Sequence, residues 1–278
     1  MRAVFTSRAG GVSPAPFDSF NLGDHVGDAP TNVSANRAAL HSAIGNRPVF
    51  LKQVHGNEVL VLDHLTADGQ VADACVTTER GVACSIMVAD CLPVLLTSED
   101  GSRVAAAHAG WRGLAGAGGL AGKGVLEAVL DVFYKRFRPL ALVERAEAAI
   151  KIIAWLGPCI GPTAFEVGAE VKDAFLQNQP DAARFFLPVS GSTSGESSGE
   201  SSVKYLADLA GLARQRLQAL GVSAIYGNDS SLDWCTASNP SRFFSHRRDA
   251  AVGAGGTGGD AGNGFGTTGR MAACIWRV

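Results

Sequence analysis

Three residues with the chemistry of metal ligands stand out in the sequence: His55, Cys91 and His108. They lie in the segments LKQVHGNEV, VADCLPVLL and VAAAHAGWRG, where an apolar, strand-like run ends at the candidate ligand and Gly or Pro follows. The ligands are 36 and 17 residues apart along the chain, too far for a zinc-finger knuckle. This spacing predicts three strands that converge on one point.

Imidazole nitrogen and thiolate sulfur are ligands that Zn²⁺ accepts, and three protein ligands leave its fourth tetrahedral position open. Structural zinc sites close that position with a fourth protein ligand, often in CxxC pairs, and the sequence contains no CxxC. The pattern therefore predicts an open, reactive site. Spacing alone leaves a plainer alternative, in which the histidines are polar residues at strand ends and Cys91 fills the core.

The elements that must position these residues are of mixed type. Hairpins mixed with separated helices favour an α+β fold, layered, with mixed sheets flanked by helices, over a doubly wound parallel sheet. The turn at 99–102 (EDGS) is a hairpin signal, because Asp-Gly accommodates positive φ. Strand-like runs cover 4–7, 48–55, 58–63, 82–90, 92–98, 103–110, 151–157, 223–227 and 271–278. Helical patterns cover 31–44, 119–137, 166–177 and 203–220.

Two segments differ from the rest in composition. Residues 190–202 are rich in Ser, Gly and Glu and contain no apolar side chain, so they cannot offset the entropy of ordering. Residues 253–266 are rich in glycine and lack the GxxxxGK[ST] pattern of a phosphate-binding loop. We predict one domain over 1–278 with flexible insertions at these two places.

The composition argues against several classes of protein. Lys and Arg number 24 against 26 Asp and Glu, so no global charge favours nucleic acid or an anionic membrane as a partner. The six cysteines are widely separated, which argues against a disulfide framework and for a reducing compartment. No apolar run approaches the roughly 18 residues of a membrane span, and the first residues, MRAVFTSRAGG, lack the long apolar segment typical of a secretion leader. We expect a cytoplasmic protein.

Several blocks together resemble a known family: FTSRAGGVS, FDSFNLGDHVGD, LKQVHGNEV, VADCLPVLL, AAHAGWRGLAGAGG, LGPCIGPTAFEVG and FFSHRRD. They are similar to the YfiH-like proteins, first called multicopper polyphenol oxidases or laccase-domain proteins. That family is now described as zinc-dependent purine nucleoside phosphorylases with adenosine deaminase activity. The resemblance implies a single α+β domain and one zinc per chain, held by His55, Cys91 and His108. One departure is His246, where the family commonly has Tyr.

Phosphorolysis of a nucleoside requires groups that hold phosphate, and the planar fork of arginine is suited to it. The candidates are Arg8 in TSRAGG, Arg112 in HAGWRG, and Arg247 and Arg248 in SHRRD. Arg112 is favoured because it follows ligand His108 by four residues. The alternative for each arginine is a solvated position on the surface.

Three more polar residues adjoin the motifs. Asp90 either orients a ligand or acts as an acid/base, unless it only caps a turn. Gln53 would share a side of its strand with His55 and contact the base or ribose, or else occupy a plain ladder position. Asn21 either contacts the ligand or holds a tight turn.

The leading hypothesis is a zinc-dependent purine nucleoside phosphorylase acting on adenosine, inosine and, as a further candidate, methylthioadenosine, with adenosine deaminase activity. The expected partners are a nucleoside and phosphate, and the expected assembly is a monomer or small homo-oligomer. The first alternative is a hydrolase that edits peptidoglycan precursors, a role assigned to part of the family. A copper polyphenol oxidase is disfavoured, because only two of the six histidines stand in a ligand-like context.

Overall fold

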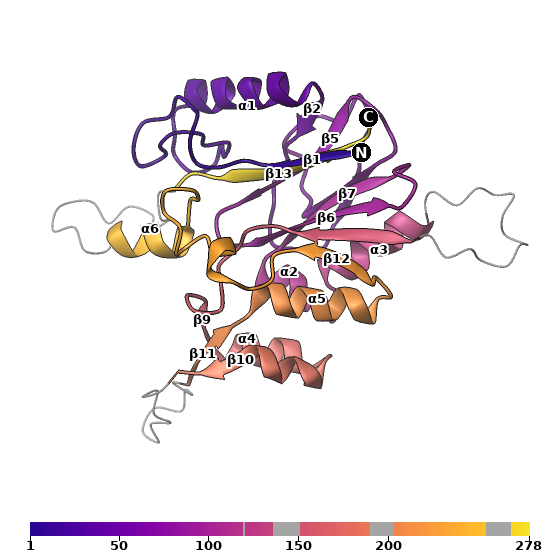
Figure 1. The fold of residues 1–278 in the computed structure, drawn as a ribbon, viewed down its shortest axis with the longest axis vertical. Helices are drawn as coiled ribbons and strands as arrows, with labels where there is room; N and C mark the ends of the chain where they lie inside the picture. The colour runs from indigo at the N-terminus through magenta and orange to yellow at the C-terminus, as the bar shows by residue number, and fades with distance from the viewer. Residues whose placement is uncertain (119, 136–150, 190–202, 254–267) are drawn as a thin grey trace, which may run out of the picture.

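The computed structural model of the chain describes residues 1–118, 120–135, 151–189, 203–253 and 268–278. Two mixed β-sheets are stacked face to face, with helices on both outer sides (Figure 1). The predicted insertion at 190–202, and all of the second insertion after Gly253, lie outside the described residues. Gly253 itself ends helix α6 (His246–Gly253).

The first sheet has four strands in the order β1 (Arg2–Phe5), β13 (Met271–Trp276), β5 (Val82–Val88) and β2 (Arg47–Val49). Only β2 and β5 pair in parallel, so the sheet is mixed. In β1 and β13, the first and last strands of the chain, Arg2 lies opposite Trp276, and the chain ends therefore lie close together (Figure 1).

The second sheet has six strands. Their order is β12 (Ala224–Gly227), β8 (Ile152–Leu156), β6 (Leu92–Ser98), β7 (Val104–Ala109), β4 (Ala74–Thr77) and β3 (Val59–Val61). The pairs β12–β8 and β3–β4 are parallel and the others antiparallel. Strands β6 and β7 form the predicted hairpin, where Gly101 has φ 67°, a conformation that favours glycine.

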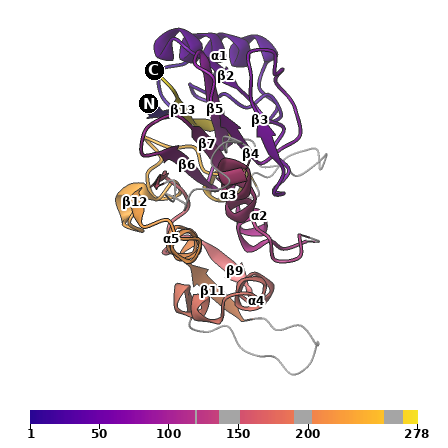
Figure 2. The same cartoon turned by 90° about the vertical axis from the view of Figure 1, so that its right-hand side faces the viewer.

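Side chains alternate between the two faces of each strand, and apolar side chains lie on both faces of the two large sheets. An inner core between the two sheets holds Ile86, Leu95, Ala106 and Ala273, all almost fully buried. The opposite face of the first sheet packs against α1 (Pro30–Ile44) through residues such as Trp276. The outer face of the second sheet is covered by α2 (Trp111–Ala115), α3 (Val125–Lys135) and α5 (Leu209–Ala219), on the side away from α1 (Figure 2).

A small antiparallel sheet lies beyond these layers, in the order β10 (Phe186–Pro188), β11 (Lys204–Ala207), β9 (Glu166–Gly168). It lies beside α4 (Ala169–Leu176), at the opposite end of the molecule from α1 (Figure 1). Two short 3-10 helices, η2 (Pro180–Phe185) and η3 (Leu232–Trp234), complete the described elements.

The predicted fold class is confirmed: the chain is an α+β protein with mixed sheets flanked by helices. Several predicted elements are wrong in their bounds; the helix expected over 119–137 begins at Val125. The helix expected over 203–220 begins at Leu209, because Asp208 accepts a hydrogen bond from the Gly211 N–H at 2.8 Å and residues 204–207 pair as β11. The helix expected over 166–177 loses its first three residues to β9. The strand expected over 48–55 ends at Val49.

No helix in the described ranges combines the length and the apolar character that crossing a membrane requires.

Candidate metal centre

The three predicted ligands lie together near the place where β5 leads into β6. His55 is in the loop between β2 and β3, Cys91 is in the β5–β6 connection, and His108 is near the end of β7. Their ligand atoms all lie within 4.8 Å of one another. Cys91 Sγ is 3.7 Å from His55 Nε2, and the centroids of the two imidazole rings are 4.8 Å apart. Within the described ranges this is the one group of three such residues close enough to share a metal ion.

The local structure explains how each ligand reaches this place. Val104 and Ala106 of β7 face the inner core, so strand alternation points His108 to the same side. Cys91 packs against the edge of that core. His55 does not come from a strand, as the sequence predicted, but from a loop in which its backbone has φ 61°. A non-glycine residue in this conformation is uncommon and is often found at functional sites.

The three ligands differ in how far they are exposed to solvent. His55 is exposed, Cys91 is partly buried, and His108 is only 3% exposed. The site is therefore buried at His108 and reaches the surface at His55.

A buried carboxylate, Asp73, joins two of the ligands. Its Oδ1 accepts hydrogen bonds from His108 Nδ1 at 2.8 Å and from the His55 backbone N–H at 2.9 Å. Its Oδ2 accepts from the N–H groups of Val54 and Gly56 at 3.1 and 2.7 Å. Because an ionised carboxylate only accepts, His108 Nδ1 carries the proton and Nε2 remains available as a ligand atom.

Asp73 was not among the residues singled out from the sequence. Its position just before β4 places it beside His108, whose backbone N–H donates to the Asp73 carbonyl at 2.7 Å. The only sequence signal is an acidic residue that directly precedes the buried run ACVT. That pattern is also common at turns, and it does not reveal which donors the carboxylate meets.

Gly110 allows the ligands to approach one another. A Cβ atom at this position would lie 2.8 Å from His55 Cδ2 and 3.0 Å from Cys91 Sγ, closer than carbon and sulfur atoms pack. The glycine that follows β7 is therefore required by the close packing of the site, in addition to its place at the start of α2.

The residues present fit a bound metal ion. Two imidazoles and a thiolate are ligands of zinc, and a carboxylate that orients a ligating histidine is a recurrent feature of zinc sites. Three protein ligands with an exposed side at His55 leave room for a further ligand, as catalytic zinc sites do.

The ligands also influence each other's protonation. Burial would raise the pKa of Cys91, but the charge and hydrogen bonds of His108 and His55 lower that pKa to about 6. Burial would lower the pKa of His108, but Cys91 and Asp73 raise it to about 9. The free site at neutral pH is thus a thiolate beside an imidazolium, and the proton on His108 Nε2 must leave before a metal binds there.

This arrangement predicts how metal affinity depends on pH. Because the pKa of His108 lies at about 9, the proton competes with the metal up to that pH. We expect the apparent Zn²⁺ affinity to rise about tenfold per pH unit between pH 6 and 9 and to level off above 9. Below pH 6 the dependence is steeper, because the Cys91 thiol must also lose its proton. Competition titration with a chelating dye at several pH values measures this slope, and a slope that ends near pH 6.5 would contradict it.

Asp90, the predicted acid/base residue, has both carboxylate oxygens engaged. Oδ1 accepts from the Thr236 hydroxyl at 2.6 Å, and Oδ2 accepts from the Arg247 backbone N–H at 2.6 Å. Its side chain is buried and its backbone has φ 91°. Asp90 therefore ties the loop that carries Cys91 to the C-terminal part of the chain.

Gln53 and Asn21 are likewise held by the protein. The Gln53 amide donates to the Met87 carbonyl and accepts from the Met87 N–H, both at 2.8 Å. Asn21 is fully buried, and its amide bridges Gly23, Asp28 and the backbone N–H of Arg270. The Asn21 side chain holds the turn at residues 21–23 in this structure.

Two of the predicted phosphate ligands, Arg8 and Arg248, lie within networks of protein acceptors. Arg8 donates to the carbonyl groups of Asp18 and Pro240 and pairs with the Asp18 carboxylate at 3.2 Å. Arg248 pairs with Asp249 at 2.8 Å and donates to backbone carbonyls, including that of Thr236. Both side chains stabilise the connections around α6 in this structure.

The other two predicted phosphate ligands, Arg112 and Arg247, are exposed. Arg112 lies over the ring of Trp111 at 4.7 Å, in α2 directly after the ligand strand β7. Arg247 donates to the Glu166 carbonyl at 2.9 Å and lies near the ring of Phe165. Neither guanidinium pairs with a carboxylate of a residue that the structure describes.

A fifth arginine, Arg270, was missed from the sequence although it belongs to the segment TGRMAACIW. It immediately precedes β13, whose first residue, Met271, lies opposite Val88 at the end of β5. This register brings Arg270 beside the segment 89–91 that carries Cys91, and its charge interacts with those of Asp90 and Cys91. Residue type alone does not mark it, because a basic residue next to a strand is an ordinary boundary.

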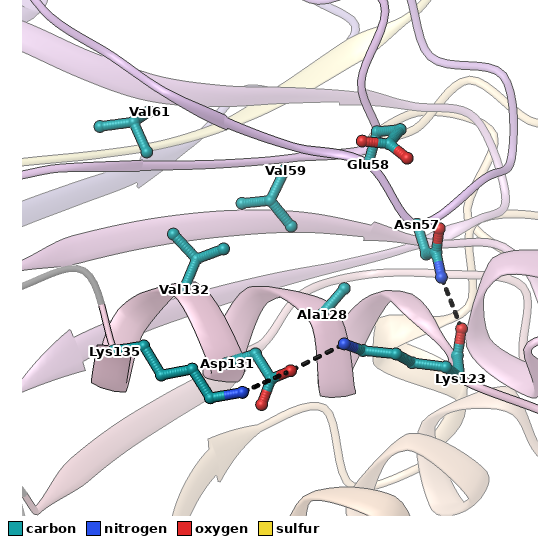
Figure 3. A pocket seen from close by; sticks show the side chains of 9 residues that line it. All are labelled: Asn57, Glu58, Val59, Val61, Lys123, Ala128, Asp131, Val132 and Lys135. Carbon is teal, nitrogen blue, oxygen red and sulfur yellow. Dashed lines mark hydrogen bonds and ion pairs between the residues drawn. The ribbon is translucent and has the colours of Figure 1, made fainter.

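A separate groove of about 600 Å³ lies between β3 and α3 (Figure 3). It is lined by Asn57, Glu58 and α3 residues, and its charged groups pair with one another: Asp131 binds Lys123 at 2.7 Å and Lys135 at 3.3 Å. None of the three metal ligands lines it, although Asn57 follows His55 by two residues. The groove is therefore a neighbour of the metal centre and not a part of it.

The chain is similar in sequence to characterised proteins over almost its whole length. It is 41% identical over 278 residues to "Purine nucleoside phosphorylase YfiH" of Escherichia coli (strain K12), with 99% of this chain and 93% of that protein covered. It is 41% identical over 276 residues to "Purine nucleoside phosphorylase PA4543" of Pseudomonas aeruginosa, with the same coverage.

Solved structures agree with the fold. The Neisseria meningitidis protein NMB0706 superposes with a TM-score of 0.74 at 38% identity, and 99% of this chain and 93% of that one are covered. The Bacillus licheniformis hypothetical protein YfiH gives a TM-score of 0.76 at 27% identity, with 99% and 92% covered. A family model described as "Multi-copper polyphenol oxidoreductase laccase" matches residues 2–278. With its His–Cys–His group, its two stacked sheets and these relatives, the chain belongs to that laccase-like YfiH family.

Proposed function

We propose that the chain is a zinc-dependent purine nucleoside phosphorylase acting on adenosine and inosine, with methylthioadenosine as a further candidate substrate. The observation that carries the proposal is the open group of His55, Cys91 and His108, oriented by Asp73. The reaction is taken from the relatives that bear this name and align with 99% of the chain.

Zinc is favoured over copper despite the description of the family model. Multicopper oxidases bind their metals through several histidine-rich clusters, whereas the described part of this chain holds one group with two histidines and a cysteine. That donor set matches an open zinc site. Metal analysis of the purified protein tests the choice directly.

Phosphorolysis breaks the bond between ribose C1′ and the purine nitrogen and forms a bond from C1′ to a phosphate oxygen. When bound, zinc would supply Lewis-acid polarisation at its open position. The protein's own contribution is orientation: Asp73 fixes the His108 ring and the His55 backbone, so the ligand set is preorganised. The exposed guanidinium groups of Arg112 and Arg247 are proposed to contact phosphate or ribose from the rim.

The remaining predicted residues are proposed to act by positioning. Asp90 holds the Cys91 loop against Thr236 and Arg247, and a role as acid/base would require one oxygen to exchange its present donor. Gln53 holds the end of β5 through Met87. Asn21, Arg8 and Arg248 hold the loops that surround the first sheet.

We further propose that the same site converts adenosine to inosine. Deamination replaces the amino group at purine C6 by oxygen from water, and it uses the same open position beside the three ligands. The exposed side of His55 gives water and nucleoside access to that position. Both reactions act on one class of substrate, and the dependence on phosphate separates them.

The test is a phosphate-dependence assay on the purified protein, with zinc and copper measured on the same sample. Adenosine and inosine are supplied with and without inorganic phosphate, and the products are separated by chromatography. We expect about one zinc per chain, with free base and ribose 1-phosphate formed only when phosphate is present. Inosine formed from adenosine without phosphate would report deamination.

Two results would change the assignment. If zinc is bound but neither nucleoside is consumed, the site acts on another substrate, and the hydrolysis of peptidoglycan precursors becomes the leading hypothesis. If copper is bound in place of zinc and phenolic substrates are oxidised, the phosphorylase proposal is wrong.

A further inference from the structure

The guanidinium group of Arg270 occupies an unusual position beside the metal centre. Its residue is mostly buried, and its Nη1 donates to the carbonyls of Thr268 and Gly269 at 2.9 and 3.2 Å. Among the residues that the structure describes, no acceptor meets Nε or Nη2 and no carboxylate pairs with the group. A largely buried cation with one edge of its fork unused is a donor surface for an anion.

The arginine is held firmly in this position. The Asn21 side chain accepts a hydrogen bond from its backbone N–H at 2.9 Å, and β13 begins at the next residue. Gly23 lies directly against its aliphatic stem, where a Cβ atom would come within 2.7 Å of Arg270 Cγ. The 21–23 loop thus holds the start of the side chain, while the Thr268 and Gly269 carbonyls hold Nη1, so the group is preorganised and little entropy is lost on binding.

The acidic groups around Arg270 are already engaged with other donors. Each oxygen of the Asp90 carboxylate accepts one hydrogen bond, from the Thr236 hydroxyl and from the Arg247 backbone N–H. Asp24, on the adjacent loop, pairs with Arg37 at 3.3 Å. Burial lowers the pKa of Arg270, while Cys91 and Asp90 raise it. Among the described residues, the edge of Arg270 that carries Nε and Nη2 is therefore left without an anionic partner.

We infer that Arg270 forms the binding site for inorganic phosphate beside the metal centre, presenting its unused N–H edge to the phosphate oxygens. The inference rests on the proposed function and specifies which residue receives the second substrate. It adds Arg270, beside the metal centre, to the contact proposed for Arg112, whose exposed guanidinium lies over Trp111 at the rim. The step contributed by Arg270 is binding and orientation of phosphate, with no proton transferred by the arginine.

The experiment compares Arg270→Gln and Arg270→Lys with the wild type, each with its zinc content measured. Binding of inorganic phosphate is followed by isothermal titration calorimetry in the absence of nucleoside, and KM is measured separately for phosphate and for inosine. Arg277→Gln is the matched control, because Arg277 directly follows β13 as Arg270 directly precedes it, and it also donates to backbone carbonyls.

We expect Arg270→Gln to raise both the Kd and the KM for phosphate by about tenfold to a hundredfold, since a charge-assisted contact is lost. The KM for inosine should change by less than about threefold, and Arg277→Gln should match the wild type in both constants. Arg270→Lys should give an intermediate value for phosphate, because it keeps the charge and loses the fork.

Unchanged phosphate affinity and KM in Arg270→Gln, in a wild type that requires phosphate, would overturn the inference and leave the proposed function standing. If that variant does not fold, Arg270→Lys decides, and a wild-type KM for phosphate in it would overturn the inference. A wild type that neither binds nor requires phosphate would overturn the proposed function together with the inference.

Discussion

Cys91→Ala is expected to abolish nucleoside turnover, with a fall of roughly a thousandfold or more, while the protein remains folded. The substitution removes the thiolate and leaves only two imidazoles, which are insufficient for a stable open zinc site. The structural cost is small, because Cys91 lies at the edge of the inner core and loses a single sulfur atom, about 1 kcal/mol. On one preparation, the zinc content checks the loss of metal, circular dichroism checks that the protein remains folded, and steady-state rates check the loss of turnover.

The matched control is Cys274→Ala, which removes a buried thiol on the face of β13 that packs towards α1. It should lower the melting temperature at least as much as Cys91→Ala and leave turnover per bound zinc unchanged. If Cys91→Ala unfolds the protein while the control stays folded, the metal has a structural role, and the catalytic assignment fails.

Asp73→Asn is expected to have the second-largest effect, on both metal affinity and stability. The carboxylate accepts four hydrogen bonds, two at each oxygen, and an amide replaces one of these oxygens by an NH₂ donor. Two of the four donors then face another donor at a buried position. We expect a loss of about 2–4 kcal/mol in the free energy of unfolding and a fall of about 10- to 100-fold in zinc affinity.

Urea unfolding and chelator competition measure the two effects of Asp73→Asn. Asp131→Asn serves as the control, since Asp131 makes only exposed ion pairs with Lys123 and Lys135, which contribute little. Its unfolding free energy should change by less than about 1 kcal/mol. Wild-type zinc affinity in Asp73→Asn would show that the carboxylate supports the fold without orienting the ligands.

Local pattern predicted the fold class, whereas the convergence of the three ligands was predicted from spacing together with the resemblance to YfiH-like proteins, because spacing alone left an alternative open. Apolar runs and turn signals mark β5, β6 and β7, and each ligand lies at or near the end of an apolar run. The error at 48–55 has a physical reason: Phe50 and Leu51 are buried like strand residues, but they pack from a loop. Apolar character reports burial and does not distinguish a strand from a buried loop.

The partners of the polar residues could not be predicted, since they depend on contacts between distant segments. Asp73 meets donors 17 to 19 residues before it and 35 residues after it. Arg8 and Arg248 donate to carbonyl groups that only the folded chain brings near. Arg270 lies beside the metal centre because of the register between β13 and β5, which residue types alone do not specify.

The position of β13 has a consequence for the order in which the protein matures during synthesis. This strand is made after the other strands of its sheet, yet it lies in the interior of that sheet, between β1 and β5. Until it leaves the ribosome, β1 and β5 have an open gap between them, and the Cys91 loop lacks its neighbour Arg270. The first sheet therefore cannot be completed until β13 has been made, and Arg270 reaches the Cys91 loop only then.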